Sequence, residues 1–292
     1  MTSVSLASQL SKTRFVKDIV FRFTVTLSIV FALFFILFIV AVLYFQGRES
    51  LNLDFLRNFP SARPSRAGIQ SAIFGSIWVV GVATLMAVPI GIISAVFLEE
   101  FVKPTSRVAK LIDLNIRNLA GVPAVVFGMI GLAFIARGFF SWGFTVRTAA
   151  AVLAMMILPV VIIVSREAIK AVPPSIKQGA LALGATPWQA TWRTTLPIAL
   201  PGMATGSILA VSRAMGESAP LLLLGALAFV TFNPEGLDSD YTILPLIIFR
   251  YATDAKEEFH ALAAAASIVL MTILFIMNLT AILIRDRSQK GA

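Results

Sequence analysis

The charged residues Arg213 and Glu217 stand four positions apart in an otherwise apolar stretch, Ala-Val-Ser-Arg-Ala-Met-Gly-Glu-Ser-Ala-Pro-Leu. A separation of four places both side chains on one face of a helix, within reach of each other. The planar guanidinium of an arginine can hold a phosphate-like oxyanion through two parallel hydrogen bonds. The glutamate can orient the arginine and accept a hydrogen bond from a protonated oxygen of the anion. The pair therefore indicates an anion path, with a buried ion pair that only fixes helix register as the alternative.

The composition shows that this stretch lies in a membrane protein. Of the 292 residues, 58% are hydrophobic and 13% are charged, and the mean hydropathy is +0.89. Soluble domains have about 25% charged and roughly 45 to 50% apolar residues. One charge at the centre of a membrane helix costs about 2.5 to 3.5 kcal/mol, so two charges are expected to pair. The predicted fold class is all-α and polytopic.

Several kinds of chemistry are excluded by what the sequence lacks. It contains no cysteine and one histidine, which excludes disulfides, thiolate nucleophiles and histidine-rich metal sites. The dipeptide Gly-Lys never occurs, so the chain has no phosphate-binding P-loop of its own. We therefore expect no catalytic residue, no cofactor and no metal, and an integral-membrane enzyme is the least favoured class.

Six apolar runs are long enough to cross a bilayer as helices. They extend over residues 23–45, 71–98, 114–136, 149–165, 201–230 and 261–284. The first is predicted to be a retained anchor helix in contact with membrane lipid, because it is too long for a signal peptide and no small-x-small cleavage site follows. Residues 1–22 precede it as a cytoplasmic tail, and residues 70–285 form the main domain. Gly202 and Gly206 have the small-xxx-small spacing of a close helix contact, for which another subunit is one partner to consider.

The basic residues predict the orientation of the spans. With six spans, both termini lie on one side, and that side holds 15 of the 24 Lys and Arg residues, whereas the other side holds 8. By the positive-inside rule the termini are cytoplasmic. The net charge of +9 therefore reflects topology and requires no nucleic-acid partner.

The cytoplasmic connection 166–200 is much longer than the about 2 to 8 residues that join two helices. Two Ser/Thr-x-x-Gln patterns, at Ser175 and Thr186, match the capping box that starts a helix. Gly184 lies between them, where a helix end favours a residue with positive φ. The predicted order is helix, glycine, helix. Two short amphipathic helices could dock in a groove of another protein or lie on lipid headgroups, and residue physics leaves both open.

This connection resembles the EAA loop of ABC importer permeases, written EAA-xxx-G-x9-I-x-LP. The matching positions and their neighbours are Gln178, Gly179, Ala180, Gly184, Ala185, Thr186, Leu196 and Pro197. Gln178 replaces the usual glutamate and Gly179 the usual alanine, which removes an ionic contact that the glutamate would make. The resemblance implies a type I ABC importer permease fold, in which the loop forms a coupling helix that sits in a cleft of the ATP-hydrolysing subunit.

The charged pair lies in a second such motif. Residues 212–221 resemble the R-A-x-G-E-[ST]-A-P-L signature of the two permeases of the phosphate-specific ABC importer. This resemblance implies that Arg213 and Glu217 take part in phosphate translocation, with Ser212 and Ser218 beside them on the substrate path.

Two further segments agree with this family. Residues 118–128, Asn-Leu-Ala-Gly-Val-Pro-Ala-Val-Val-Phe-Gly, resemble its N-L-A-G-V-P-S-[IV]-V-[YF]-G segment, but Ala124 replaces the usual serine and removes a hydroxyl. Residues 244–249 and 257–265 resemble the A-type subunit rather than the C-type.

The resemblance implies an assembly with a paralogous permease, two copies of a cytoplasmic ATPase and an extracytoplasmic phosphate-binding protein, in the bacterial inner membrane. One alternative is a permease of the same architecture for another oxyanion, sulfate or molybdate. Another is a stand-alone secondary transporter that uses Glu217 as a proton carrier.

Overall fold

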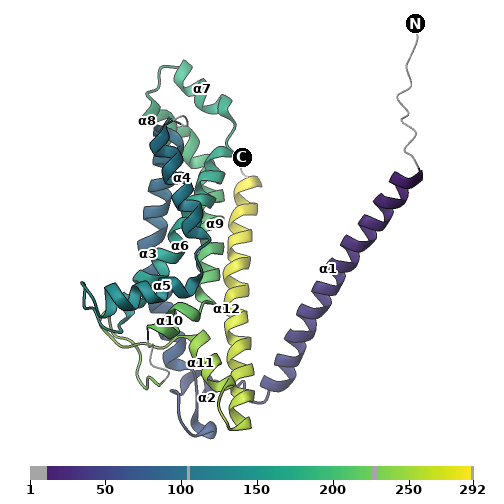
Figure 1. The fold of residues 1–292 in the computed structure, drawn as a ribbon, viewed down its shortest axis with the longest axis vertical. Coiled ribbons are helices and arrows are strands. Elements are labelled where there is room, and N and C mark those ends of the chain that lie inside the picture. The colour runs from purple at the N-terminus through teal and green to yellow at the C-terminus, as the bar shows by residue number, and fades with distance from the viewer. Residues whose placement is uncertain (1–11, 104–105, 225–228, 291–292) are drawn as a thin grey trace.

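The computed structural model describes residues 12–103, 106–224 and 229–290, which form helices joined by turns (Figure 1). The α-helices are α1 Lys12–Gly47, α2 Leu53–Arg57, α3 Gln70–Val96, α4 Arg107–Ala120, α5 Ala124–Ile130, α6 Val146–Lys170, α7 Pro174–Ala182, α8 Pro187–Ala190, α9 Leu196–Met215, α10 Ala219–Leu223, α11 Leu244–Ala252 and α12 Glu257–Lys290. A 3-10 turn η1 covers Pro64–Arg66, and π-helical turns cover η2 Phe97–Phe101, η3 Gly131–Ala136 and η4 Thr191–Thr195. Within the described ranges, the β-type pairing is one isolated bridge, between Thr145 and Asp240. The all-α prediction is confirmed.

Five helical segments are long and apolar enough to cross a membrane, and a bent pair, α4 with α5, can supply a sixth crossing. The five are Lys17–Gly47, Gln70–Phe101, Val146–Lys170, Pro187–Met215 and Glu257–Asp286. In Figure 1, α7 and the end of α12 lie at one end of the molecule, here called the α7 end, and α2 and α11 lie at the other, the α11 end. Because α3 leads to the α7 end and α6 starts from the α11 end, the bent pair carries the chain back across the bundle.

The third span differs from the continuous helix expected over residues 114–136. α4 and α5 meet at an angle of 100°, with Gly121, Val122 and Pro123 between them. Pro123 has no amide hydrogen to donate and disfavours the helical conformation of the residue before it, so the helix breaks there. α4 is also the more polar half, with Ile116 as its one buried residue.

The fifth span is displaced relative to the predicted range 201–230. A continuous helical segment begins earlier, at Pro187, and ends at Met215. Gly216 follows as the C-cap, and the chain turns into the short helix α10. Residues 225–228 of the predicted span lie outside the described ranges.

Small residues let the central helices α3, α6 and α9 approach closely. A Cβ added to Gly91 of α3 would lie 2.6 Å from Cγ1 of Val161 on α6. A Cβ added to Gly206 of α9 would lie 2.8 Å from Cβ of Val164, and one on Gly202 would lie 3.0 Å from the Cβ of Ala168. The predicted small-xxx-small contact is therefore made with α6 of the same chain rather than with another subunit.

Helix α1 stands apart from the bundle (Figure 1). None of the residues in its most apolar window is buried, which suits a helix surrounded by lipid. It is joined to α12 near its end, where a Cβ on Gly47 would lie 2.6 Å from the backbone nitrogen of Ala265. The helix begins at Lys12, inside the predicted tail 1–22, and residues 1–11 of that tail lie outside the described ranges.

The α11 end is closed by side-chain hydrogen bonds to the backbone. The Tyr251 hydroxyl donates to the Gly68 carbonyl oxygen at 2.9 Å, and burial raises the pKa of this phenol to about 12, so it stays protonated as a donor. The Ser71 hydroxyl donates to the Val230 carbonyl oxygen at 2.7 Å. These bonds fix the chain that leads into α11 against the start of α3.

Candidate anion path and coupling segment

Arg213 and Glu217 lie at the point where α9 ends. The amide of Gly216 donates to the Arg213 carbonyl oxygen at 3.1 Å, and the amide of Glu217 donates to the Ala214 carbonyl oxygen at 3.1 Å, so one tight turn joins the two residues. Arg213 Nε lies 3.8 Å from Glu217 Oε1, which confirms the predicted reach. The predicted shared helix face is wrong, because α9 ends at Met215 and Glu217 follows its C-cap Gly216. The Arg213 side chain is 74% exposed and that of Glu217 is 26% exposed, so the guanidinium points away from the subunit's own core.

Both charged side chains line a small cleft of about 50 Å³. Roughly 10 to 15 Å³ of such a cavity volume holds one water, so the cleft has room for a few waters. Its other walls come from α4, α5, the turn between them, α6 and α9, through Leu119, Ala120, Val122, Ala124, Phe127, Met156, Ile157, Val160, Ala210 and Ala214. The structure thus brings the two motifs of residues 118–128 and 212–221 to one place. Apolar walls beside the mostly buried Glu217 carboxylate strengthen its interaction with a bound ion, whereas the Arg213 guanidinium is largely exposed.

The flanking serines lie away from this cleft. Ser212 is 5% exposed, and its hydroxyl has no hydrogen-bond partner among the described residues. The Ser218 backbone carbonyl accepts from the amides of Leu221 and Leu222 and so starts α10. Neither serine is among the lining residues of the cleft. At position 124, the alanine places a methyl group on the cleft wall.

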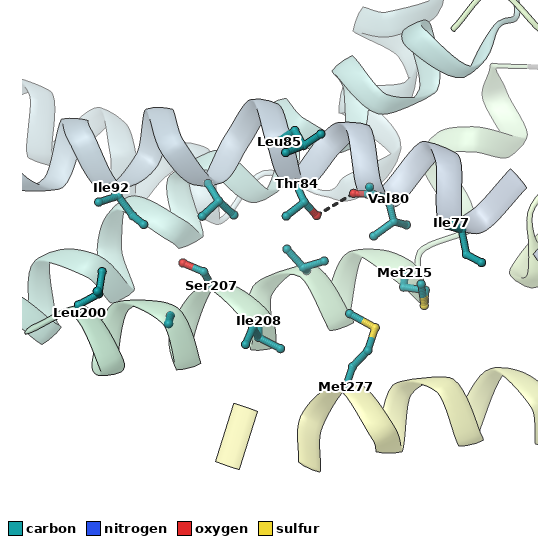
Figure 2. Close-up of a pocket in the computed structure, with 14 residues that line it drawn as sticks. Ile77, Val80, Thr84, Leu85, Ile92, Leu200, Ser207, Ile208, Met215 and Met277 are labelled. Atoms are coloured by element: carbon teal, nitrogen blue, oxygen red, sulfur yellow. Dashed lines mark hydrogen bonds between the residues drawn. The ribbon is translucent and has the colours of Figure 1, made fainter. Parts of the chain in front are cut away.

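A larger groove of about 680 Å³ runs between α3 and α9, with Met277 of α12 at its edge (Figure 2). Its polar groups are hydroxyls such as that of Thr84, which donates to the Val80 carbonyl oxygen at 2.7 Å. No charged side chain is among its described lining residues. A desolvated oxyanion there would have no counter-charge, which makes the smaller cleft the better candidate for an anion path.

The coupling segment has the predicted order of helix, glycine, helix. α7 ends in a Schellman motif, since the amide of Ala185 donates to the Ala180 carbonyl oxygen and that of Gly184 to Leu181. Gly184 has φ +88°, as predicted for the residue between the helices. In the capping box at the start of α8, the Gln189 backbone N–H donates to Thr186 Oγ1 at 3.2 Å. The Thr186 backbone N–H donates in turn to the side-chain oxygen Oε1 of Gln189 at 2.9 Å.

The capping box predicted at Ser175 is wrong. α7 begins at Pro174 with Pro173 as its N-cap, so Ser175 lies inside the first turn. Proline at the first helical position fixes φ near the helical value, and the residue before it becomes the cap.

The remaining residues of the loop motif lie on α7 and at the start of α9. Gln178 and Gly179 are exposed on α7. Pro197 is exposed at the start of α9, whereas Leu196 packs against the buried apolar cluster at this end of the bundle. Leu183 is 92% exposed beside Gly184. The segment therefore presents apolar side chains outward at the α7 end.

An ionic cluster that the sequence patterns did not predict lies beneath this segment. Arg166 of α6 donates from Nε to Glu99 of η2 and from Nη1 to Asp113 of α4. Asp113 also accepts from Arg117 Nε at 2.9 Å, and Lys170 Nζ lies 3.6 Å from Glu99. These side chains tie together η2, α4 and α6. The opposite charges at the ends of neighbouring predicted spans are the signal in the sequence that could have indicated this cluster.

Comparison with known proteins places the chain among membrane components of ABC transport systems. Residues 87–289 match the family described as binding-protein-dependent transport system inner membrane component. The chain is 31% identical over 253 residues to the probable ABC transporter permease protein YqgI of Bacillus subtilis, which covers 81% of this chain and 84% of that protein. It is 31% identical over 220 residues to phosphate transport system permease protein PstA 1 of Mycobacterium tuberculosis, covering 75% and 70%. It is 26% identical over 257 residues to phosphate transport system permease protein PstA of Haemophilus influenzae, covering 87% and 88%.

Solved structures share the fold. A chain of a bacterial alginate ABC transporter superposes with a TM-score of 0.66 at 16% identity, covering 94% of this chain and 96% of that one. A chain of the inward-facing MetNI methionine ABC transporter superposes with a TM-score of 0.60 at 16% identity, covering 74% and 94%. The family match includes both the coupling segment and the Arg213–Glu217 cleft, and the protein therefore belongs to the family of binding-protein-dependent transport system inner membrane components, the permease subunits of ABC importers.

Proposed function

We propose that this chain is the A-type permease subunit of an ATP-driven, binding-protein-dependent importer of inorganic phosphate. The observation that carries the proposal is the Arg213–Glu217 pair on an apolar cleft beside the bent third span. Relatives that are 26 to 31% identical over most of the chain and are named phosphate transport system permease proteins support this substrate over sulfate or molybdate.

In the proposed assembly, a paralogous permease covers the face on which Arg213 is exposed, so that the anion path runs between the two subunits. Two copies of a cytoplasmic ATPase bind at the α7 end, one of them on the coupling segment of this chain. An extracytoplasmic binding protein delivers phosphate at the α11 end. The excess of basic residues supports a cytoplasmic location for the α7 end and for both termini.

The two charged side chains have different roles in this proposal. The Arg213 guanidinium binds two oxygens of the anion through parallel hydrogen bonds. The Glu217 carboxylate only accepts hydrogen bonds, so it favours an anion that carries a proton on one oxygen. Phosphate carries such a proton near neutral pH, whereas sulfate does not. Glu217 therefore favours phosphate and repels a fully ionised competitor.

The transport cycle couples this path to the ATPases. ATP binding closes the ATPase pair and moves the coupling segment, and the bundle opens toward the binding protein. Phosphate then passes Arg213 and Glu217, and hydrolysis returns the bundle to the inward-open state.

The test is uptake of labelled phosphate into proteoliposomes that contain the complete transporter, with its ATPase and binding protein. We expect ATP-dependent uptake that excess sulfate and molybdate do not compete away. The Arg213→Gln variant should lose about tenfold or more, because a charge-assisted hydrogen bond is worth about 1.5 to 3 kcal/mol. Arg22→Gln, on the exposed face of α1, is the matched control and should transport normally.

Two results would overturn the proposal. Efficient competition by sulfate or molybdate would assign the path to another oxyanion. Proton-driven uptake by this chain alone, without an ATPase, would identify a secondary transporter.

A further inference from the structure

Glu100 is a buried carboxylate that connects the bundle with the coupling segment. It lies in η2, the π turn that continues α3, and its side chain is 7% exposed. One carboxylate oxygen, Oε2, accepts from Lys177 Nζ on α7 and from Thr191 Oγ1 on η4, the latter at 2.8 Å. A single side chain of the α3 segment thus holds both helical parts of the coupling segment.

An aromatic contact lies next to this ionic one. The rings of Phe101 and Trp188 have centroids 5.7 Å apart, and those of Trp188 and Trp192 lie 5.3 Å apart. Phe101 follows Glu100 in η2, and the two tryptophans flank Thr191, which is 1% exposed. Two independent contacts therefore join η2 to the start of the fifth span.

Glu99, the residue before Glu100, reaches in another direction. It accepts from Arg166 on α6 and lies near Lys170 of the same helix. Successive side chains on a helix point about 100° apart, so neighbouring carboxylates can bind different elements. Glu99 joins η2 to the bundle, and Glu100 joins it to the coupling segment.

The hold on α7 depends strongly on Glu100. α7 contains no buried residue, and the half-buried Ile176 is its apolar contact with the cluster at this end. A desolvated carboxylate that loses its partner is costly, so the Glu100–Lys177 pair favours one fixed position of α7 relative to α3.

We infer that Glu100 is the positioning residue that makes the coupling segment and α3 move as one body, so that motion imposed on α7 by the ATPase reaches the bundle. The inference rests on the proposed function, since it assumes an ATPase at the α7 end. In a variant without this carboxylate, the ATPase should still hydrolyse ATP, but hydrolysis should no longer be coupled to anion uptake.

The test measures ATP hydrolysis and anion uptake together, in proteoliposomes of the complete transporter carrying Glu100→Gln. We expect hydrolysis within about twofold of wild type and uptake per ATP lower by about tenfold, the scale of a lost charge-assisted hydrogen bond. Glu167→Gln is the matched control, because Glu167 lies at the same end with a 62% exposed side chain that pairs with Lys170. Uptake per ATP equal to wild type in Glu100→Gln would overturn the inference.

Charge reversal separates positioning from simple loss of structure. Glu100→Lys and Lys177→Glu should each uncouple transport, and the double variant should recover most of the wild-type uptake per ATP. Failure of the double variant to recover, when it assembles in the membrane as well as wild type, would also overturn the inference. A wild-type transporter that carries sulfate or molybdate instead of phosphate would contradict the proposed function only. The inference about Glu100 could still be tested, because uptake per ATP hydrolysed can be measured with that anion.

Discussion

Gly128 of α5 lies directly against Pro220 of α10. A Cβ added to Gly128 would lie 2.5 Å from the carbonyl oxygen of Pro220 and 2.7 Å from its Cα. This contact joins the segment that follows the break in the third span to the segment that follows the end of α9. Phe127, the neighbour of Gly128, lines the same cleft as Arg213, so the backbone contact lies next to the wall of the candidate anion path.

Replacing Gly128 by alanine should separate these two segments. Backbone atoms block the added methyl group, and overpacking of this kind costs about 1 to 3 kcal/mol. We expect a lower melting temperature in detergent and reduced uptake. Gly81→Ala is the control, because a Cβ on Gly81 of α3 meets nothing within 4 Å and alanine favours the helix. Equal melting temperatures of the two variants would contradict the role of the contact.

Glu217→Gln should narrow the preference for phosphate over sulfate. The neutral amide accepts a weaker hydrogen bond from the protonated oxygen and no longer repels a fully ionised anion. Phosphate uptake should fall by about five- to tenfold, as expected for about 1 kcal/mol, while sulfate competes better. Glu49→Gln, exposed near the end of α1, should leave both unchanged. An unaltered sulfate competition curve in Glu217→Gln would count against the role of the carboxylate.

Gly184→Pro should abolish uptake although the protein still inserts in the membrane. The residue has φ +88° and its amide donates to Leu181, whereas proline fixes φ near −65° and has no amide hydrogen. Gly184→Asn should retain most activity, because asparagine tolerates the left-handed conformation. ATP-driven uptake is measured for both, and normal uptake by the proline variant would disprove the predicted importance of this kink.

Thr186→Ala should loosen the start of α8, whereas Ser175→Ala should not loosen that of α7. The first removes a side-chain cap worth about 1 kcal/mol, and the second removes a hydroxyl that caps nothing. Amide hydrogen exchange read by mass spectrometry should be faster over residues 187–195 in the first variant only. Equal exchange in the two variants would show that the capping box contributes no stability.

The two capping patterns also show where local sequence information suffices. Both match Ser/Thr-x-x-Gln, but only at Thr186 is the cap followed immediately by a proline, Pro187. At the other helix the proline precedes Ser175, and the helix begins at Pro174, two residues too early for the box to form. The position of the proline, which is visible in the sequence, decides between the two.

The sequence by itself determined the helical class, the kink at Gly184 and the short distance between Arg213 and Glu217. These depend on hydrophobic runs, on residues with special φ and on side chains only four positions apart, all of which act over short stretches of chain. Only the tertiary structure decided that Ala124 would line the same cleft as Arg213, that Arg166 would join Glu99 to Asp113, and that Glu100 would hold Lys177. Each of these contacts joins separate elements, and their meeting depends on how closely glycines such as Gly91 and Gly128 let the backbones pack, which no single stretch of sequence encodes.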